Sequence, residues 1–229
     1  MNAARVLVLA ALAAVALAVT VEVYQTAKDT EDRLTRKEDL EMKSYHDEAN
    51  VTITLQRNFQ YQTILGFGGA FTEATAVTIS QMLPELQEEI IQAYFGVNGS
   101  RYNWGRVHIN SCDFSVESYS YCDTPDDFNL TTWKFDDSVD TRYLIPLIQR
   151  AKAVSQDEIR LFASPWSPPA WMKKNEDMVG TVFPRGLKDG PEYEATWASY
   201  FSRWLSEYKA HVRFCGSIFA LLLNVSLGH

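Results

Sequence analysis

The amino-acid sequence predicts an α/β fold with a parallel sheet. Short apolar runs alternate along the chain with longer stretches of helical periodicity, and this order is typical of strands joined by crossover helices. The chain has 229 residues, 46% of them hydrophobic, which is enough for one sizeable core. The loops after the predicted strands are long, and folds of this class bind ligands at that end of the strands. We therefore expect residues 67–71, 113–121 and 164–171 to gather around one pocket.

Features of a secretory signal open the chain. Arg5 precedes an apolar run at residues 6–19, and the small residues Ala16 and Ala18 fit a cleavage site. A membrane anchor is the alternative, but the run is shorter than the roughly 20 residues that span a bilayer. We therefore expect residues 1–18 to be a signal peptide.

Acceptor triplets for N-glycosylation support the secretory route. They stand at Asn50, Asn98, Asn129 and Asn224. One such triplet means little, but several behind a signal peptide indicate passage through the secretory pathway.

Charge and cysteine content exclude several kinds of partner. The net charge is -8 and no run of Lys and Arg is present, so nucleic acid is not an expected partner. The cysteines are Cys112, Cys122 and Cys215, an odd number that leaves at least one unpaired. Cys112 and Cys122 form a possible disulfide in an oxidising compartment, and the pairing stays open. Their spacing matches no zinc pattern and no His lies nearby in a ligand arrangement, so we expect neither metal nor cofactor.

The first part of the chain offers few signals of regular structure. Residues 26–48 are dense in charge and poor in apolar residues, which indicates a mobile segment with partial helix. Val51, Ile53 and Leu55 then alternate with polar residues, and this pattern predicts a half-buried strand at residues 50–56.

A glycine-rich stretch and two helices follow. Residues 61–71 are extended and end in several glycines, where the backbone turns tightly or approaches a ligand closely. A helix is predicted at residues 73–82 with Thr72 as its N-cap. A second helix is predicted at residues 84–94, because proline suits its first turn and glycines follow its end.

Three strands and two helices complete the predicted pattern. The strands fall at residues 103–112, 159–166 and 217–226, and the helices at residues 143–154 and 192–211. The last helix carries a broad aromatic face, which we interpret as core packing.

Two tryptophans stand in the proline-stiffened loop LFASPWSPPAWMKKN, residues 161–175. Prolines reduce the freedom of a loop, so a side chain there is aimed before a ligand arrives. Aromatic rings beside carboxylates indicate sugar binding, since a pyranose offers C–H groups on one face and hydroxyls at its rim. Trp166 fits a sugar platform and a buried hydrophobe equally well, whereas Trp171 is predicted to be buried.

Polar residues on and after the strand that follows the second helix are further candidates. Asp113 comes after that strand and serves either a ligand or a turn. Arg106 lies among apolar residues and therefore predicts a carboxylate partner. His108 shares its face and is predicted to be a satisfied interior residue. Asp126 and Asp127 are predicted to form a turn.

Three long motifs resemble those of one enzyme family. They are GFGGAFTEATA at residues 66–76, RVHINSCDFS with YSYCDTPDDFNL within residues 106–130, and LFASPWSPPAWMK at residues 161–173. In this order they resemble the glucosylceramidases of glycoside hydrolase family 30, from about residue 50 to residue 211. The resemblance implies a (β/α)8 barrel beside a small β-domain, and hydrolysis of a β-glucosidic bond with retention by two glutamates.

The resemblance also implies roles for individual residues. Asp113 and Trp166 resemble the residues that hold the glucose hydroxyls, and Phe114 would help to wall the pocket. Arg106 resembles an arginine that supports the nucleophile. The implied substrate is glucosylceramide or another β-glucoside, met at a membrane surface in lysosomal or secreted sphingolipid metabolism.

The chain departs from the family pattern near its end. The family carries its acid/base in an Asn-Glu-Pro motif after the fourth strand, whereas residues 214–229 contain no glutamate. The last glutamate is Glu207, inside a predicted helix, and a full barrel takes about 250 residues. We therefore expect a charged segment at residues 19–49, strands of the β-domain at residues 50–63, and a partial barrel of three to four βα units at residues 64–229.

Such a chain is expected to be an inactive fragment of a glucosylceramidase, because it lacks both the acid/base and the nucleophile. The alternatives are a secreted sugar-binding pseudoenzyme and a family member that acts on another β-glycan.

Overall fold

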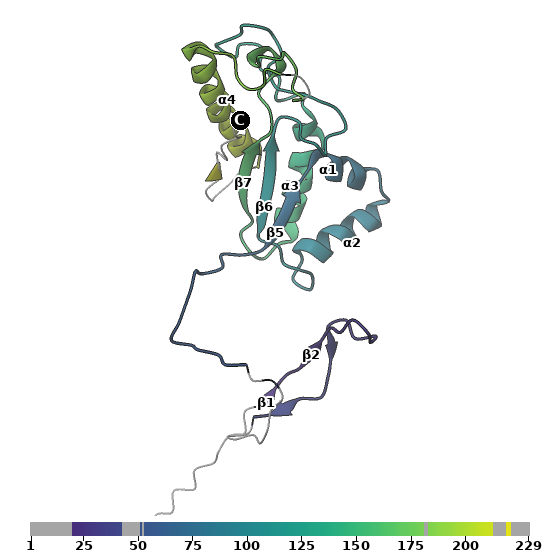
Figure 1. Cartoon of the computed structure of the whole chain (residues 1–229). Coiled ribbons are helices and arrows are strands. Elements are labelled where there is room, and N and C mark those ends of the chain that lie inside the picture. Colours follow the sequence, from purple (N-terminus) through teal and green to yellow (C-terminus); the bar gives the residue numbers. More distant parts are fainter. Residues whose placement is uncertain (1–19, 43–50, 52, 181–182, 213–218, 221–229) are drawn as a thin grey trace, which may run out of the picture. The chain divides into compact units, whose positions relative to one another are not determined.

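The computed structural model describes residues 20–42, 51, 53–180, 183–212 and 219–220. The chain divides into two compact units, Met1–Gln62 and Thr63–His229 (Figure 1). Several predicted features lie outside the described residues: the signal peptide at residues 1–18, Asn50, Asn224, Cys215 and most of the strand at residues 217–226. No helix within the described ranges is both long and apolar enough to cross a membrane.

The first unit contains two short antiparallel strand pairs. They are β1 (Thr20–Val21) with β4 (Leu40–Glu41), and β2 (Tyr24–Gln25) with β3 (Thr35–Arg36). In the turn between β2 and β3, Asp32 accepts hydrogen bonds from Lys37 Nζ at 3.0 Å and from Gln25 Nε2 at 2.6 Å. These donors lower the pKa of the Asp32 carboxyl. The partial helix predicted for residues 26–48 is wrong in the described part, where the backbone turns back to pair strands.

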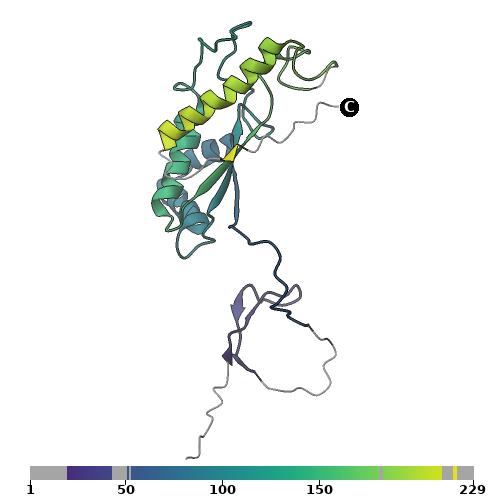
Figure 2. The ribbon, with the colours of Figure 1, turned by 90° about the vertical axis from the view of Figure 1, so that its left-hand side faces the viewer.

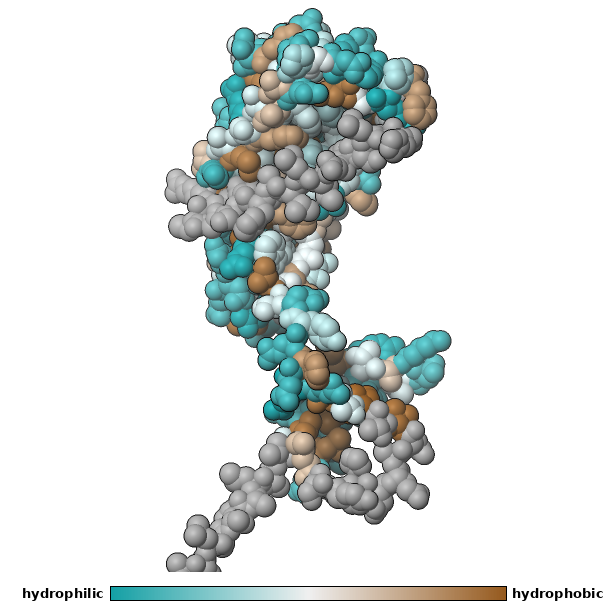
Figure 3. All heavy atoms as spheres, turned by 60° about the vertical axis from the view of Figure 1, so that its left-hand side comes forward, coloured by the Kyte–Doolittle hydropathy of each residue, from teal (hydrophilic) through white to brown (hydrophobic). Residues whose placement is uncertain are grey.

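The half-buried strand predicted at residues 50–56 is also wrong in the described part. Val51, Ile53 and Leu55 are 78%, 82% and 83% exposed and belong to no strand. An alternating pattern gives a strand only where a partner bonds the backbone and a surface covers the apolar face, and the described residues supply neither. Figure 3 shows hydrophobic side chains among the exposed atoms of one face of the molecule.

A parallel sheet organises the second unit, as predicted. Its strands, in spatial order, are β5 (Gly68–Phe71), β6 (Trp104–Ile109), β7 (Arg160–Pro165) and β8 (Phe219–Ala220). Their register places Ala70, Arg106 and Phe162 in one row across β5, β6 and β7. Neighbouring residues in such a row point to the same side of a sheet.

The two faces of the sheet differ in what covers them. Phe71, Val107 and Ala163 form the adjacent row and are buried in the core. Helices lie on that side of the sheet, as Figure 2 shows. On the other side, Arg106 and Phe162 are only partly buried. The sheet therefore presents one helix-covered face and one face that carries polar and aromatic side chains.

The helices match the predicted positions closely. They are α1 (Glu73–Ser80), α2 (Pro84–Phe95), α3 (Ile145–Val154), which continues a π-helical turn at Asp140–Leu144, and α4 (Pro191–Val212). Thr72 Oγ1 accepts a hydrogen bond from Thr75 N at 3.2 Å and caps α1, as predicted. Tyr200, Trp204 and Tyr208 of α4 are fully buried, which confirms that its aromatic face is core packing.

Gly68 shows why the stretch before α1 is rich in glycine. A Cβ atom at this position would lie 1.6 Å from the carbonyl oxygen of Trp104 on the neighbouring strand. The glycines were predicted to allow either a tight turn or a close approach of the backbone to a ligand. At Gly68 the backbone does approach another group closely, but that group is the neighbouring strand.

Candidate functional site

The carboxyl ends of β6 and β7 lie side by side. Ile109 and Pro165 are register partners, and Trp166 N donates a hydrogen bond of 3.4 Å to the Ile109 carbonyl oxygen. Trp166 directly follows β7, and Asp113 comes four residues after the end of β6. The two residues therefore follow adjacent strands at the same edge of the sheet.

Trp166 is held by an arginine from the partly exposed face of the sheet. The guanidinium carbon of Arg106 lies 4.3 Å from the centre of the indole ring, a distance typical of a cation–π contact. Arg106 Nε also donates a hydrogen bond of 3.3 Å to Ser164 Oγ. Among the described residues no carboxylate pairs with Arg106, so the predicted carboxylate partner is wrong there. An aromatic face and a hydroxyl take its place, because the half-buried side chain keeps part of its hydration.

Trp171 differs from Trp166 and is buried, as predicted. Its ring packs edge-on against Phe128 at 5.6 Å, and its Nε1 donates a hydrogen bond of 2.9 Å to the Cys122 carbonyl oxygen. Trp171 therefore belongs to the core beneath the loop.

Asp113 and Phe114 lie in an exposed turn. Ser115 N donates to the Cys112 carbonyl oxygen at 3.0 Å, and Cys112 N donates to Ser115 Oγ at 3.0 Å, so the turn is closed without the Asp113 side chain. The carboxylate of Asp113 makes no hydrogen bond within the described residues, and Phe114 is 64% exposed. Both side chains are thus accessible to a ligand.

Two buried polar residues tie these segments together. Glu73 Oε2 accepts a hydrogen bond of 2.8 Å from Val116 N, which fixes the segment after Asp113 to the start of α1. Asn110 Nδ2 donates a hydrogen bond of 2.8 Å to the Ser167 carbonyl oxygen, which fixes the end of β6 to the segment after Trp166. Neither residue is marked as functional by a local sequence pattern.

His108 is the satisfied interior residue that was predicted. It is buried, its Nε2 accepts a hydrogen bond of 3.0 Å from Glu73 N, and its Nδ1 lies 2.6 Å from the Asn110 carbonyl oxygen. Since a carbonyl only accepts, Nδ1 carries the proton and the ring is neutral.

A buried carboxylate anchors the long loop between β6 and α3. Asp140 accepts hydrogen bonds from the hydroxyls of Tyr119, Tyr121 and Tyr208 at 2.8, 2.9 and 2.6 Å. Burial, and then the charge of Asp140, raise the pKa of all three tyrosines, so they stay protonated donors. No sequence pattern indicates this cluster, because Tyr208 lies far along the chain from Asp140 and the other two tyrosines.

The acidic pair after Cys122 forms a turn, as predicted. Asp126 has a left-handed backbone, and Asp127 accepts hydrogen bonds from the backbone and side chains of Thr131 and Thr132. The backbone N–H groups of Thr131 and Thr132 are the main cause of a lowered pKa at Asp127.

The possible disulfide between Cys112 and Cys122 is not formed in this structure, where both thiols are free. Cys122 is buried and its Sγ faces Asp127 Oδ2 at 3.4 Å, whereas the Cys112 thiol faces Ser115. The two sulfur atoms are thus engaged with different partners, and burial raises the pKa of Cys122.

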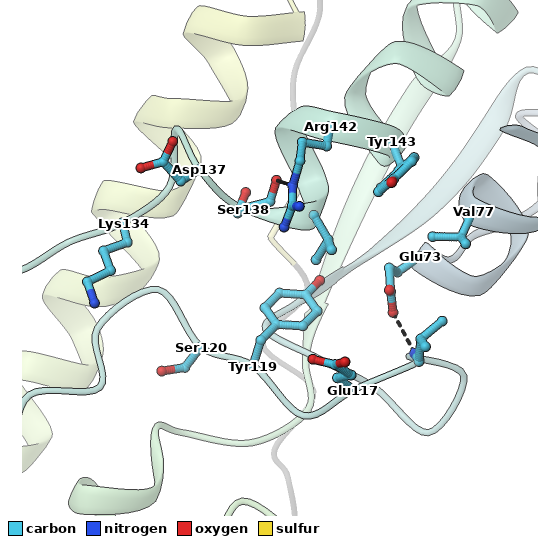
Figure 4. Close-up of a pocket in the computed structure, with 12 residues that line it drawn as sticks. Glu73, Val77, Glu117, Tyr119, Ser120, Lys134, Asp137, Ser138, Arg142 and Tyr143 are labelled. Atoms are coloured by element: carbon cyan, nitrogen blue, oxygen red, sulfur yellow. Dashed lines mark hydrogen bonds between the residues drawn. The ribbon is translucent and has the colours of Figure 1, made fainter.

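A cavity of about 460 Å³ lies beside the loop that carries Asp113 (Figure 4). Its lining residues are Glu73, Val77, Val116, Glu117, Tyr119, Ser120, Lys134, Asp137, Ser138, Val139, Arg142 and Tyr143. Part of the predicted segment 113–121 contributes to its wall, whereas segments 67–71 and 164–171 do not line this cavity, and the shared pocket of all three segments stays a prediction.

Asn98 and Asn129 are the two acceptor asparagines that the structure describes, and both are exposed. Their side chains are therefore accessible.

The sequence comparisons agree with this architecture. The family model described as the glycosyl hydrolase family 30 TIM-barrel domain matches residues 64–219, which contain the whole parallel sheet except the last residue of β8. The chain belongs to glycoside hydrolase family 30. This confirms the predicted family resemblance and the fold class of a partial barrel.

Two individual proteins show the extent of the sequence similarity. The chain is 42% identical to a mouse lysosomal acid glucosylceramidase over 156 residues, covering 68% of this chain and 30% of the relative. It is 41% identical to putative glucosylceramidase 3 of Caenorhabditis elegans over 192 residues, covering 82% and 36%. The chain thus spans about a third of the length of these relatives.

Solved structures give the same fold. The crystal structure of SrfJ from Salmonella typhimurium superposes with a TM-score of 0.70 at 33% identity, over 78% of this chain and 38% of that one. An endo-β1,6-glucanase superposes with a TM-score of 0.64 at 28% identity, over 83% and 40%. An endo-β1,6-glucanase is therefore among the proteins whose fold resembles that of this chain.

Proposed function

We propose that this chain forms the glucose-binding part of a glucosylceramidase-type β-glucosidase. The observation that carries the proposal is the placement of Asp113 and Trp166 just after two adjacent strands, at one edge of the sheet. In barrel folds that edge is where substrates bind.

The chemistry of these side chains suits a pyranose. The Asp113 carboxylate is exposed and free to accept hydrogen bonds from sugar hydroxyls. Trp166 offers an indole whose orientation is set by Arg106 at 4.3 Å. Phe114, also exposed, would add an apolar wall. Arg106 thus acts as a positioning residue, and in a complete site we expect it also to support a neighbouring carboxylate.

The polypeptide itself is proposed to bind β-glucosides without hydrolysing them. Retaining glycosidases need two carboxyl groups about 5–5.5 Å apart, one on each side of the scissile bond. Glu73 is buried and already accepts the Val116 amide. Glu207, the last glutamate of the sequence, lies on α4, which follows β7. We therefore expect neither glutamate to pair with Asp113 in catalysis.

The proposed substrate class is a glucosylated lipid of sphingolipid metabolism, met at a membrane surface. The support is the 42% identity to a mouse lysosomal acid glucosylceramidase. The same likeness, with the apolar N-terminal run and the exposed acceptors Asn98 and Asn129, supports a secretory or lysosomal location and glycosylation. No cofactor or nucleic acid is needed for this function.

A β-1,6-glucan is the second candidate substrate. The chain is 31% identical over 151 residues to an endo-1,6-beta-D-glucanase of Neurospora crassa. The lower identity places this candidate behind the glucosylated lipid.

Calorimetric titration of the full chain tests the proposal and ranks the substrates. We expect saturable binding of an alkyl β-glucoside, weaker binding of the β-1,6-linked disaccharide, and at least tenfold weaker glucoside binding in Trp166→Ala and Asp113→Asn. Asp126→Asn, in the exposed turn, is the control and should leave glucoside binding unchanged. Trp171 is buried, so Trp171→Phe would change the core and cannot serve as this control. Binding that both site variants leave unchanged would refute the assignment. Turnover of a fluorogenic β-glucoside above a heat-killed control would refute the proposed inactivity.

A further inference from the structure

Three metal-binding side chains meet where the loop before α3 approaches the end of α4. Glu207 and His211 are one turn apart on α4 and share one face of the helix, while Asp136 comes from the loop. His211 Nε2 lies 3.3 Å from Asp136 Oδ1 and 4.0 Å from Glu207 Oε2. One donor atom from each residue lies within 4.8 Å of the other two.

These separations are close to those around a small divalent cation. Zinc binds imidazole nitrogen and carboxylate oxygen at about 2.0–2.2 Å, which places tetrahedral donor atoms about 3.3–3.5 Å apart. The 3.3 Å between His211 and Asp136 already has this value. The 4.0 Å between His211 and Glu207 exceeds it slightly, and the rotatable Glu207 side chain can close the difference. Three protein donors would leave one position for water.

The local electrostatics also favour a cation. With a neutral imidazole, Asp136 and Glu207 bring two negative charges to one point. Arg203 Nε approaches the Glu207 carboxylate only at 4.0 Å and therefore neutralises it in part. His211 lies in the last turn of α4, where the helix dipole further attracts positive charge.

The backbone around the cluster is held in place by other contacts. Gln149 Nε2 and Lys152 Nζ each donate a hydrogen bond of 2.9 Å, to the carbonyl oxygens of His211 and Val212. The His211 ring also packs at 5.5 Å from the buried ring of Phe135, the residue before Asp136. Such support orients ligands before a metal arrives and reduces the cost of binding.

We propose that Asp136, Glu207 and His211 form a divalent-cation site of the zinc class. The ion would join the loop before α3 to the end of α4. Sequence spacing could not indicate this site, because Asp136 lies far along the chain from the helical pair. The simpler account of the same contacts is an ion pair between protonated His211 and Asp136, which needs no metal.

Titration of the metal-stripped full chain with Co²⁺ and then Zn²⁺ distinguishes the two accounts. We expect one equivalent of Co²⁺ to give the visible absorption of tetrahedral nitrogen and oxygen coordination, and Zn²⁺ to displace it. A tenfold excess of Zn²⁺ over its Kd should raise Tm by about 3–6 °C. Cysteine-bound Co²⁺ would differ through its thiolate charge-transfer band in the near ultraviolet.

Variants locate the bound ion. His211→Gln, Glu207→Gln and Asp136→Asn should each weaken Zn²⁺ binding at least tenfold. Asp136 is 87% exposed, so its variant keeps the fold and provides a clean measurement. Asp137→Asn makes the same chemical change one residue away, at another exposed position, and should leave the affinity unchanged. Zn²⁺ affinity that is equal in all four variants and the parent chain, or octahedral Co²⁺ alone, would establish the plain ion pair and overturn the proposal.

Discussion

Tyr208 donates a hydrogen bond of 2.6 Å to Asp140 and so joins α4 to the turn that begins α3 inside the core. Both residues are fully buried. A buried carboxylate is costly unless hydrogen bonds replace its lost hydration, and Tyr119 and Tyr121 provide two more. The loop that carries Asp113 therefore depends on this cluster, because both of those tyrosines belong to it.

Removing the Tyr208 hydroxyl should destabilise the protein. Tyr208→Phe leaves the ring in place and takes one donor from Asp140, which should lower the free energy of unfolding by about 1–3 kcal/mol. Urea denaturation followed by circular dichroism measures the change. Tyr143→Phe is the matched control, because the Tyr143 hydroxyl makes no hydrogen bond within the described residues. Equal stability of the two variants would show that the cluster contributes little.

The Asp127 turn should make stability depend on pH in the acid range. Its carboxyl pKa is lowered in the folded chain by the N–H groups of Thr131 and Thr132. Its contribution is therefore present above its unfolded pKa, about 3.9. It is lost as pH falls through the lower folded value. In Asp127→Ala, stability should fall less between neutral pH and pH 3 than in the parent chain. Asp126→Asn, at the neighbouring position, should keep the parent slope, and an unchanged slope in Asp127→Ala would contradict the assignment.

Local signals predicted the helices and the core well. Pro84 at the start of α2 and Thr72 before α1 act through adjacent backbone, so each can be identified from a few residues. Asp113 and Trp166 could also be identified from the sequence as candidate site residues, because each follows an apolar strand. The sequence could not indicate Asn110, Glu73 and Asp140, since their hydrogen-bond partners lie at distant positions along the chain. Around Val51, by contrast, a strand was predicted that the structure does not contain, because an alternating pattern carries no information about whether a partner strand is present.

Arg106 should influence sugar binding through the orientation of Trp166. Arg106→Gln removes a cation–π contact worth about 0.5–2 kcal/mol, so glucoside affinity should fall by roughly two- to thirtyfold. Calorimetric titration with the alkyl β-glucoside measures it. Arg160→Gln is the matched control, because Arg160 starts β7 and its guanidinium lies 5.9 Å from a different ring, that of Trp104. Equal loss in both variants would indicate a general charge effect instead of indole positioning.

Glu73 should determine how firmly the segment after Asp113 is held. Its Oε2 is the acceptor for the Val116 amide, and its carboxylate stands at the wall of the cavity in Figure 4. Glu73→Ala leaves that amide without its protein acceptor and enlarges the cavity, so the Val116 amide should exchange with solvent deuterium at least tenfold faster. Glu73→Gln keeps a side-chain oxygen at the same place and should preserve most of the protection.

Glu117→Ala, an exposed position on the same cavity wall, controls for the loss of a carboxylate. If exchange at Val116 is the same in Glu73→Ala as in the parent chain, the segment is held by Ser111 and Tyr119, whose backbone hydrogen bond of 3.1 Å spans it.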